Sequence, residues 1–338
     1  MIRFDYVRPT SVPDAVKALA AKPGAQVIAG GTNLVDLLKY DVAKPSRLID
    51  INRLPLRAIE DTADGGLKLG ALVTNADAAY DVRVAQRFPL LASAILAGAS
   101  AQLRNAATTG GNLLQRTRCL YFYDPHVPCN KREPGTGCPA RTGVNRNLAV
   151  LGTSEHCIAT HPSDMCVALA ALNAVVHVTG PAGERQIALS DFHRVPGDRP
   201  DLDNTLERGE LITAVEVPFS DFGRHYTYLK LRDRLSYAFA LVSVAAAVRL
   251  DAGRIDELRV ALGGVAPKPW RNLEAEGLLA GAAPERRAYE AFADRLLAGA
   301  QGFGDNDFKL GLARRAIVRA LTQAVAGTPQ SQSDKRVA

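Results

Sequence analysis

Four cysteines in the middle of the chain are the residues whose type and spacing best suit chemistry. They are Cys119, Cys129, Cys138 and Cys157. Thiolates are the soft ligands that zinc and iron–sulfur clusters require. The spacing contains no C-x-x-C pair, so it differs from a zinc ribbon and from the compact ferredoxin run. The polar loop 130–137 buries little by itself, and we expect a metal centre, with an iron–sulfur cluster favoured over zinc. Unrelated free thiols are the alternative.

The remaining candidate side chains have simpler interpretations. Cys166 begins an apolar helical pattern, so we expect a buried thiol rather than a ligand. His156 and His161 flank Cys157; either could be a ligand, and we expect polar surface histidines. The sequence offers neither a Ser-His-Asp constellation nor paired carboxylates with an acid–base logic. It therefore indicates no substrate chemistry of its own.

Two glycine-containing loops have the composition of an anion site. Residues 28–34 lie between an expected strand and an expected helix, and Gly30-Gly31 lets the backbone approach a phosphate closely. The helix that follows adds partial positive charge at its N-terminus. The loop is neither GxGxxG nor GxxxxGK. Residues 108–112 repeat the same chemistry with small hydroxyls, two glycines and an amide. Together the loops suit a pyrophosphate held from both sides.

The elements around these loops predict an α+β chain. Residues 1–55 read as a compact β-α-β-α-β unit and residues 56–222 as a second subdomain that contains the cysteine insertion 115–160. Residues 223–326 read as a three-stranded antiparallel sheet followed by helices. We expect the polar tail 327–338 to be disordered.

Composition and charge argue against several classes of protein. The net charge of +6 is dispersed among acidic residues without a basic, aromatic-rich run, so we expect no nucleic-acid partner. No apolar run approaches the roughly 20 residues of a membrane span. Residues 1–6 lack an apolar h-region, so we expect no secretory signal on this chain.

Several of these motifs resemble the FAD-binding subunit of the xanthine dehydrogenase (molybdenum hydroxylase) family. They are 29–34, 104–112, Ser163-Asp164 and 261–269. The resemblance covers nearly the whole chain and implies a two-part α/β FAD-binding domain of the vanillyl-alcohol-oxidase (PCMH) type. A C-terminal domain like that of CO dehydrogenase flavoproteins would follow.

The resemblance also implies which residues hold FAD. Both loops would hold the pyrophosphate of FAD, and Asp164 would bind the ribityl chain. Ile212 would lie against the isoalloxazine, with Lys230 and Tyr237 near the flavin. A cation such as Lys230 would stabilise negative charge on the flavin, although a surface strand lysine is the plainer interpretation. Asp164 could equally cap a helix. The full set is Gln26, Val27, Ile28, Ala29, Gly30, Gly31, Thr32, Asn33, Leu34, Thr108, Thr109, Gly110, Gly111, Asn112, Asp164, Ile212, Lys230 and Tyr237.

Within the insertion, residues 115–119, 129–132 and 157–164 are similar to one branch of that family, the flavin subunits of bacterial periplasmic aldehyde oxidoreductases. The branch implies a [4Fe–4S] cluster on the four cysteines, whereas many flavin subunits of the family lack this insertion. It also implies a molybdopterin catalytic subunit and a [2Fe–2S] subunit as partners in a heterotrimer, an external electron acceptor, and export to the periplasm with a signal-bearing partner. Without such a partner we expect a cytoplasmic location.

Two other functions are compatible with the residues alone. A stand-alone FAD oxidoreductase of the vanillyl-alcohol-oxidase type would need its own substrate pocket and catalytic base. A zinc-stapled binding module without redox activity would use the cysteines structurally.

Overall fold

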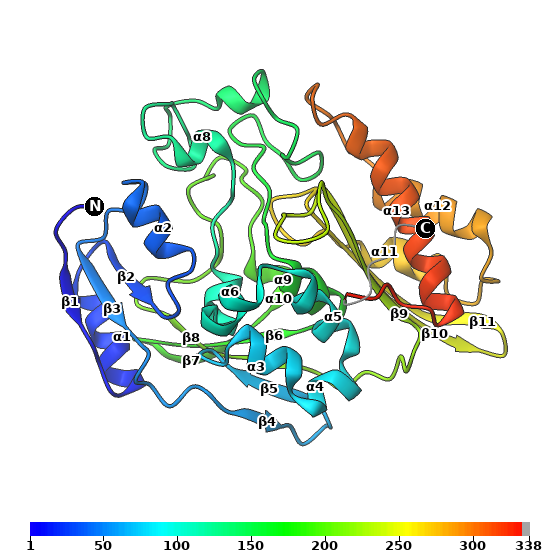
Figure 1. The fold of residues 1–338 in the computed structure, drawn as a ribbon, viewed down its shortest axis with the longest axis horizontal. Helices are drawn as coiled ribbons and strands as arrows, with labels where there is room; N and C mark the ends of the chain where they lie inside the picture. The colour runs from blue at the N-terminus through cyan, green and yellow to red at the C-terminus, as the bar shows by residue number, and fades with distance from the viewer. Residues whose placement is uncertain (333–338) are drawn as a thin grey trace.

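The computed structural model describes residues 1–332 and has the expected α+β fold (Figure 1). Its strands form three sheets. A small parallel sheet lies at the N-terminal side, a five-stranded antiparallel sheet at the base, and a three-stranded antiparallel sheet at the C-terminal side. The cysteine insertion forms a lobe above them in this view.

The first subdomain is the β-α-β-α-β unit that the sequence indicates. The parallel strand order is β1-β3-β2. Ser11 caps the first helix by accepting a hydrogen bond from the Asp14 N–H, and Pro13 lies in the first turn, where no intrahelical donor is needed. The elements are β1 (Asp5–Val7), α1 (Val12–Ala21), β2 (Ala25–Ile28), α2 (Leu34–Lys39) and β3 (Arg47–Asp50).

The second subdomain is built on the five-stranded sheet, in the order β4-β5-β8-β6-β7. The helical region 75–98 is divided into shorter helices, because Pro89 lacks a backbone N–H and begins a new one. The strands are β4 (Ile59–Asp61), β5 (Leu67–Gly70), β6 (Val175–Gly180), β7 (Gly183–Ala188) and β8 (Leu211–Val217). The helices are α3 (Asn75–Tyr80), α4 (Val82–Arg87), α5 (Pro89–Ala97), α6 (Ala101–Ala106), α7 (Thr109–Leu113), α9 (Asp164–Ala171) and α10 (Leu189–Phe192).

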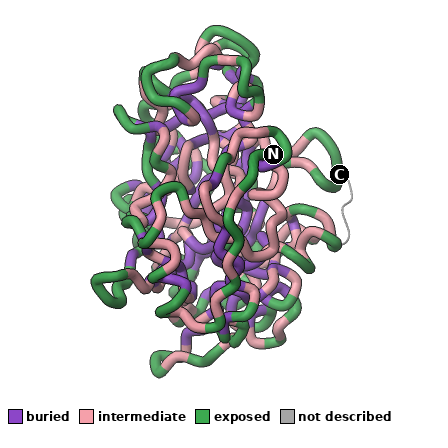
Figure 2. Tube along the Cα trace, turned by 90° about the vertical axis from the view of Figure 1, so that its left-hand side faces the viewer, coloured by how far each residue is buried: buried purple, intermediate pink, exposed green. Residues whose placement is uncertain are grey.

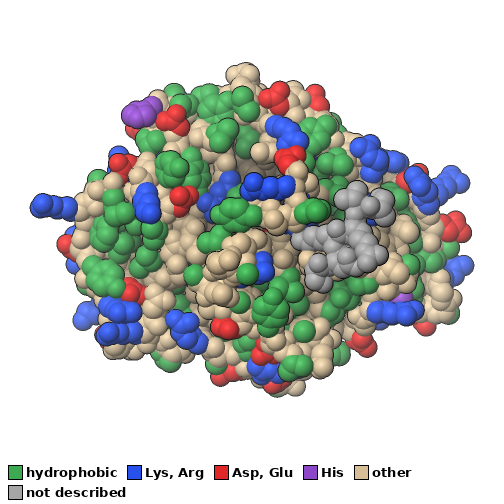
Figure 3. All heavy atoms as spheres, in the orientation of Figure 1, with side chains coloured by type: hydrophobic (Ala, Val, Ile, Leu, Met, Phe, Trp, Pro, Cys, Tyr) green, Lys and Arg blue, Asp and Glu red, His purple; other side chains and the backbone are tan. Residues whose placement is uncertain are grey.

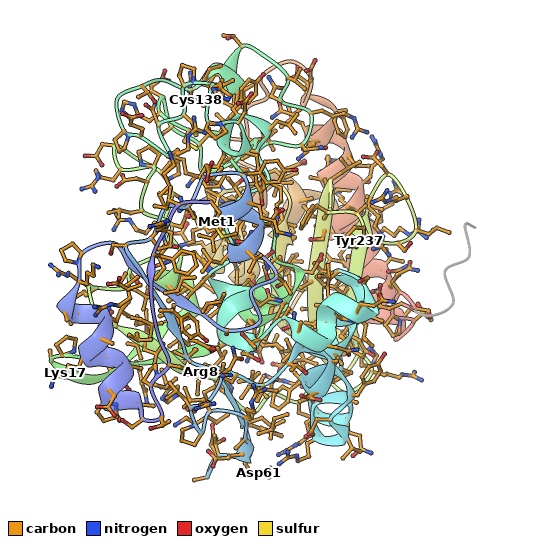
Figure 4. The ribbon with its side chains drawn as sticks, turned by 60° about the vertical axis from the view of Figure 1, so that its left-hand side comes forward. Met1, Arg8, Lys17, Asp61, Cys138 and Tyr237 are labelled. Atoms are coloured by element: carbon orange, nitrogen blue, oxygen red, sulfur yellow. The ribbon has the colours of Figure 1, made fainter. Side chains whose placement is uncertain are left out.

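The insertion has little regular structure. It contains only α8 (Leu120–Tyr123) and the short 3₁₀ helix η1 (Pro139–Arg141) within its described residues. The cysteines lie in its small apolar core, together with Phe122, Leu148 and Leu37 of α2. Figure 4 places Cys138 in this lobe, at the opposite end of the molecule from Asp61.

The C-terminal sheet is buried on both faces. Along its middle strand, Ala245 and Ala247 pack on the second subdomain, whereas Val244 and Val248 pack in the C-terminal core, because alternate side chains point to opposite faces. Helix α13 covers the face away from the second subdomain (Figure 1). The elements are β9 (Tyr226–Leu231), β10 (Val242–Asp251), β11 (Arg254–Gly263), α11 (Leu273–Gly277), α12 (Arg286–Leu296) and α13 (Phe308–Ala326).

The tail differs from the prediction in the part that the structure describes. Gly327 ends α13 in the left-handed conformation, and the chain then turns back along β9. The Gln330 N–H donates to Thr227 Oγ1 at 2.9 Å, and Gln332 Nε2 donates to Tyr228 O at 3.0 Å. Residues 327–332, which the sequence predicts to be disordered, thus have hydrogen-bond partners on β9, the edge strand of the C-terminal sheet. Residues 333–338 lie outside the described residues.

The surface agrees with the dispersed charge of the sequence. On the face shown in Figure 3, basic and acidic side chains alternate without a continuous basic block. Buried segments run through the centre of the chain trace, and exposed ones form the outer loops (Figure 2). Among residues 1–332, no helix has the length and hydrophobicity that crossing a membrane requires.

Candidate cofactor sites

A cleft of about 1670 Å³ is lined by both subdomains and by β9. This volume exceeds the roughly 300–1,000 Å³ of ordinary small-molecule sites, and an extended dinucleotide would need such room. All of the predicted FAD contacts except Thr109 line this cleft. Tertiary folding thus brings together residues from 26 to 237 that are far apart in the chain.

The first glycine loop lines the cleft with unused donors. The backbone N–H groups of Gly30, Gly31, Thr32 and Asn33 have no hydrogen-bond partner within residues 1–332. Gly31 adopts a φ of 70°, which permits the sharp turn. A Cβ atom on Gly30 would lie only 1.8 Å from Ala106 O, so only glycine lets this loop pack against the segment that leads into the second loop.

In the second loop, the backbone N–H groups of the two glycines already have hydrogen-bond partners within the protein. The N–H groups of Gly110 and Gly111 donate to Ala71 O and Thr108 Oγ1. Thr109 is fully buried, and both its N–H and its hydroxyl donate to Val73 O, so it faces away from the cleft. Asn112 accepts a hydrogen bond from Ser163, which joins this loop to the start of α9. We therefore expect side-chain groups rather than backbone N–H groups of this loop to contact a ligand.

A buried network connects the cleft to the C-terminal sheet. Asp164 Oδ2 accepts a hydrogen bond from Lys230 Nζ at 2.7 Å, and its Oδ1 accepts one from the Tyr228 hydroxyl at 2.7 Å. The Lys230 side chain is 3% exposed and also donates to Ala97 O. Burial, and then the charge of Asp164, raises the pKa of Tyr228 well above its ordinary value, so the hydroxyl remains a donor. Lys230 and Asp164 therefore act as one pair at the cleft wall.

We expect Tyr228→Phe to lower the free energy of unfolding by about 1.5–3 kcal/mol, because it removes a hydrogen bond to a buried carboxylate. Urea denaturation of the purified chain measures this change. Tyr289→Phe is the control, since the Tyr289 ring is also packed in a core, whereas its hydroxyl has no partner in the described chain. An equal loss in both variants would show that the Tyr228 hydroxyl does not stabilise Asp164.

Unpartnered polar atoms in the cleft indicate a polar ligand. Asn33 Nδ2, Asn75 Oδ1 and Arg104 Nε are buried and have no hydrogen-bond partner within residues 1–332, and all three residues line the cleft. Each such atom costs about 1–3 kcal/mol unless a ligand satisfies it. Donors from loop 30–33, a guanidinium and a carboxylate form a set that fits the phosphates and hydroxyls of FAD.

The cysteines meet in a second, smaller pocket. All four predicted ligands line it, between Phe122, Ala140 and Lys131. None forms a disulfide. Burial raises the pKa of Cys119 to about 12 and that of Cys157 to about 11, so these thiols ionise only when a cation compensates. Arg118 and Leu120, on either side of Cys119, line the FAD-sized cleft, so the pocket and the cleft share a wall.

The four pocket sulfurs are not arranged as a preformed single-ion site. Among the described residues, the only group of three with ligand atoms within 4.8 Å of one another is His161, Cys166 and His193. No three of the four pocket cysteines meet this condition. Zinc, with Zn–S bonds of about 2.3 Å, would hold its sulfurs about 3.8 Å apart. The pocket as described therefore lacks the sulfur spacing of a bound zinc ion.

A buried lysine fastens the insertion to the second subdomain. Lys131 Nζ contacts Asp203 Oδ1 and donates to Pro200 O at 2.8 Å, and it is 8% exposed. Arg116 pairs with the same carboxylate. Asp203 thus compensates two cations next to the cysteine pocket.

We expect Asp203→Asn to lower the free energy of unfolding by roughly 2–3 kcal/mol, because Lys131 keeps its buried charge without its charged partner. This loss lies between the costs of breaking an exposed ion pair and a fully buried one. Asp201→Asn breaks the exposed pair with Arg199 and weakens a charge interaction with Lys131 without removing a direct contact to it, and it should cost less than about 1 kcal/mol. Urea denaturation of both variants compares them. Equal stabilities would mean that the Asp203 pair does not hold the insertion.

Sequence reasoning did not find several residues of the sites. Tyr228 lies two residues before Lys230 on the same strand, so the alternation of β9 could have placed both on one face. Asn75 and His193 gave no sequence signal, because only tertiary packing brings them to these positions. Arg104 lies in the stretch 104–112 that carries the resemblance, but the sequence did not show that it lines the cleft.

Comparison with known proteins gives consistent results over the whole chain. The family model for the FAD-binding domain in molybdopterin dehydrogenase matches residues 2–220, and the model for the CO dehydrogenase flavoprotein C-terminal domain matches residues 225–324. The chain is 51% identical to the FAD-binding subunit of the aldehyde oxidoreductase of Escherichia coli, over 96% of this chain and 99% of that protein. It is 30% identical to the medium chain of carbon monoxide dehydrogenase from Hydrogenophaga pseudoflava, over 95% and 97% of the two chains.

Solved structures share the fold. A carbon monoxide dehydrogenase structure from Hydrogenophaga pseudoflava superposes with a TM-score of 0.76 at 29% identity, covering 97% of this chain and 99% of that chain. Quinoline 2-oxidoreductase from Pseudomonas putida 86 superposes with a TM-score of 0.74 at 25% identity, covering 97% and 98%.

Proposed function

Because the chain belongs to the FAD-binding subunits of the molybdenum hydroxylase family of oxidoreductases, we propose that it transfers electrons within an aldehyde-oxidising complex. A molybdopterin subunit would oxidise an aldehyde with water to the carboxylate, and a [2Fe–2S] subunit would deliver the electrons to this chain. FAD held in the cleft would accept them and pass them to an external acceptor. The 51% identity to an aldehyde oxidoreductase subunit favours an aldehyde substrate.

The observation that carries the proposal is the shared wall between the cleft and the cysteine pocket. Residues on both sides of Cys119 line the cleft, so a redox centre on the cysteines would lie beside a bound flavin. The cleft residues have distinct roles there. The N–H groups of loop 30–33 would hold the pyrophosphate, and Asp164 would orient the ribityl hydroxyls while Tyr228 and Lys230 fix its carboxylate.

We assign a [4Fe–4S] cluster to Cys119, Cys129, Cys138 and Cys157. The four side chains line one pocket, and their sulfurs lie farther apart than a single zinc ion requires. The Ala159 N–H lies 3.4 Å from Cys157 Sγ and would donate to the thiolate, which tunes a cluster potential. A neighbouring cation, Lys131, would partly compensate the thiolate charge.

We further propose a heterotrimer with the molybdopterin and [2Fe–2S] subunits, exported to the periplasm with a partner that carries a twin-arginine signal. Cell fractionation with the partner's signal present or deleted tests the location. Cytoplasmic flavin subunit in both strains would contradict co-export.

The test of the function is the visible spectrum of the anaerobically purified complex and of this chain, with iron and acid-labile sulfide counted. We expect flavin bands with about four irons per flavin on the isolated chain, and bleaching of the flavin bands in the complex on addition of aldehyde. Flavin without iron would refute the cluster. Zinc in place of iron would indicate a stapled module, and flavin that aldehyde reduces in the isolated chain would indicate a stand-alone oxidoreductase.

A further inference from the structure

Two histidines and a cysteine meet in the protein interior outside both cofactor sites. His161 precedes α9, Cys166 lies in its first turn, and His193 follows α10. One ring nitrogen of each histidine and Cys166 Sγ lie within 4.8 Å of one another. The two imidazole rings are 4.3 Å apart between centroids.

His193 already has the hydrogen bond that a metal-binding histidine normally makes. Its Nε2 lies 2.9 Å from Leu113 O, and a carbonyl can only accept, so Nε2 carries the proton. Nδ1 is then left with a free lone pair. This atom is buried and has no partner in the described chain, and the residue is only 3% exposed. A ligand histidine usually donates its second N–H to a backbone carbonyl in this way.

His161 and Cys166 complete the set. His161 Nε2 is also buried without a partner among residues 1–332, and Cys166 is fully buried. Burial lowers the pKa of His193 to about 4, so its imidazole is neutral, which is the ligand form. Leaving two ring nitrogens unsatisfied costs free energy, and a cation bound between them would recover it.

We propose that His161, Cys166 and His193 bind one thiophilic metal ion, Zn²⁺ or Cu⁺. Two imidazoles and a thiolate are ligands that both ions accept. Metal–ligand bonds of about 2.0–2.3 Å need ligand atoms about 3.3–3.8 Å apart, which a small movement of side chains provides. Binding displaces the Cys166 thiol proton to solvent, and Cu⁺ with one thiolate would leave the buried site neutral.

A metal ion at this site would hold two segments of the cleft wall in place without contacting the cleft itself. His161 lies two residues before Ser163, which bonds to Asn112, and three before Asp164. Leu113, the acceptor of His193, follows Asn112 directly. A bound ion would therefore fasten both cleft segments to helix α9.

The test is the zinc and copper content of the whole complex, purified from cultures supplemented with one metal or the other. We expect about one Zn or Cu per flavin-binding chain, with two nitrogens and one sulfur at about 2.0 and 2.3 Å in X-ray absorption. Cys166→Ala should lower that content at least tenfold, and Cys119→Ser, the matched cysteine control, should not. The metal whose addition to the culture gives about one ion per chain identifies the site as a Zn²⁺ or a Cu⁺ site.

Substoichiometric zinc and copper in both cultures would overturn the proposal, as would unchanged content in Cys166→Ala. If Cys166→Ala fails to fold, His161→Gln provides the same comparison, since His161 is not fully enclosed. Retained flavin in the variants separates loss of the ion from unfolding. If the cysteine pocket held zinc instead of a cluster, Cys119→Ser would lower the zinc content, so this control separates the two sites.

Discussion

We expect replacement of Cys129 with serine to remove the iron of the proposed cluster and to leave the flavin bound. Cys129 lines the pocket with the other three cysteines, and a serine hydroxyl is a poor substitute for a thiolate on iron. We expect a fall from about four irons to fewer than about one per chain. The flavin remains because the cleft residues do not include Cys129. Iron and flavin are measured together on anaerobically purified protein.

Cys166→Ser is the control for this experiment. Cys166 is a buried cysteine like Cys129 but lies outside the pocket, so this variant should keep its iron. The Cys129 variant should also unfold at lower urea concentration, because metal binding and folding of the irregular insertion are coupled. Full iron content in Cys129→Ser, or equal loss in both variants, would rule out the four-cysteine ligand set.

Replacing Gly30 with alanine abolishes tight FAD binding. The new Cβ would lie 1.8 Å from Ala106 O, which is a backbone atom, so the first loop must move away from the segment before the second loop. Overpacking of this kind costs about 1–3 kcal/mol, which corresponds to roughly 5–150-fold weaker binding if the loops separate. Fluorescence titration of the deflavinated protein with FAD measures the Kd.

Gly277→Ala is the matched glycine control. Gly277 lies in α11, and a Cβ there meets nothing within 4 Å, so binding should not change. Circular dichroism of both variants distinguishes a moved loop from an unfolded chain. Unchanged affinity in Gly30→Ala would show that FAD does not depend on the close approach of the two loops.

The sequence by itself determined the local motifs and secondary-structure elements of this protein. Gly30-Gly31 between a strand and a helix, and four cysteines in a polar insertion, were recognisable because backbone freedom and thiolate chemistry depend on residue type alone. The β-α-β-α-β unit and the antiparallel C-terminal sheet followed from periodicity, which reflects which faces are buried. Contact of individual residues with FAD stays a prediction.

Only the tertiary structure decided which of these motifs and residues contact one another. Thr109 matched the loop motif, yet both of its donors bond to Val73 O in the segment between β5 and α3, because buried backbone groups must find partners. The pairing of Asp164 with Tyr228 and Lys230 joins residues 64 and 66 positions apart. Likewise, spacing along the chain could not show that the four cysteines line one pocket. Contacts of this kind depend on how separate elements pack, and that packing is set by the whole core rather than by any local pattern.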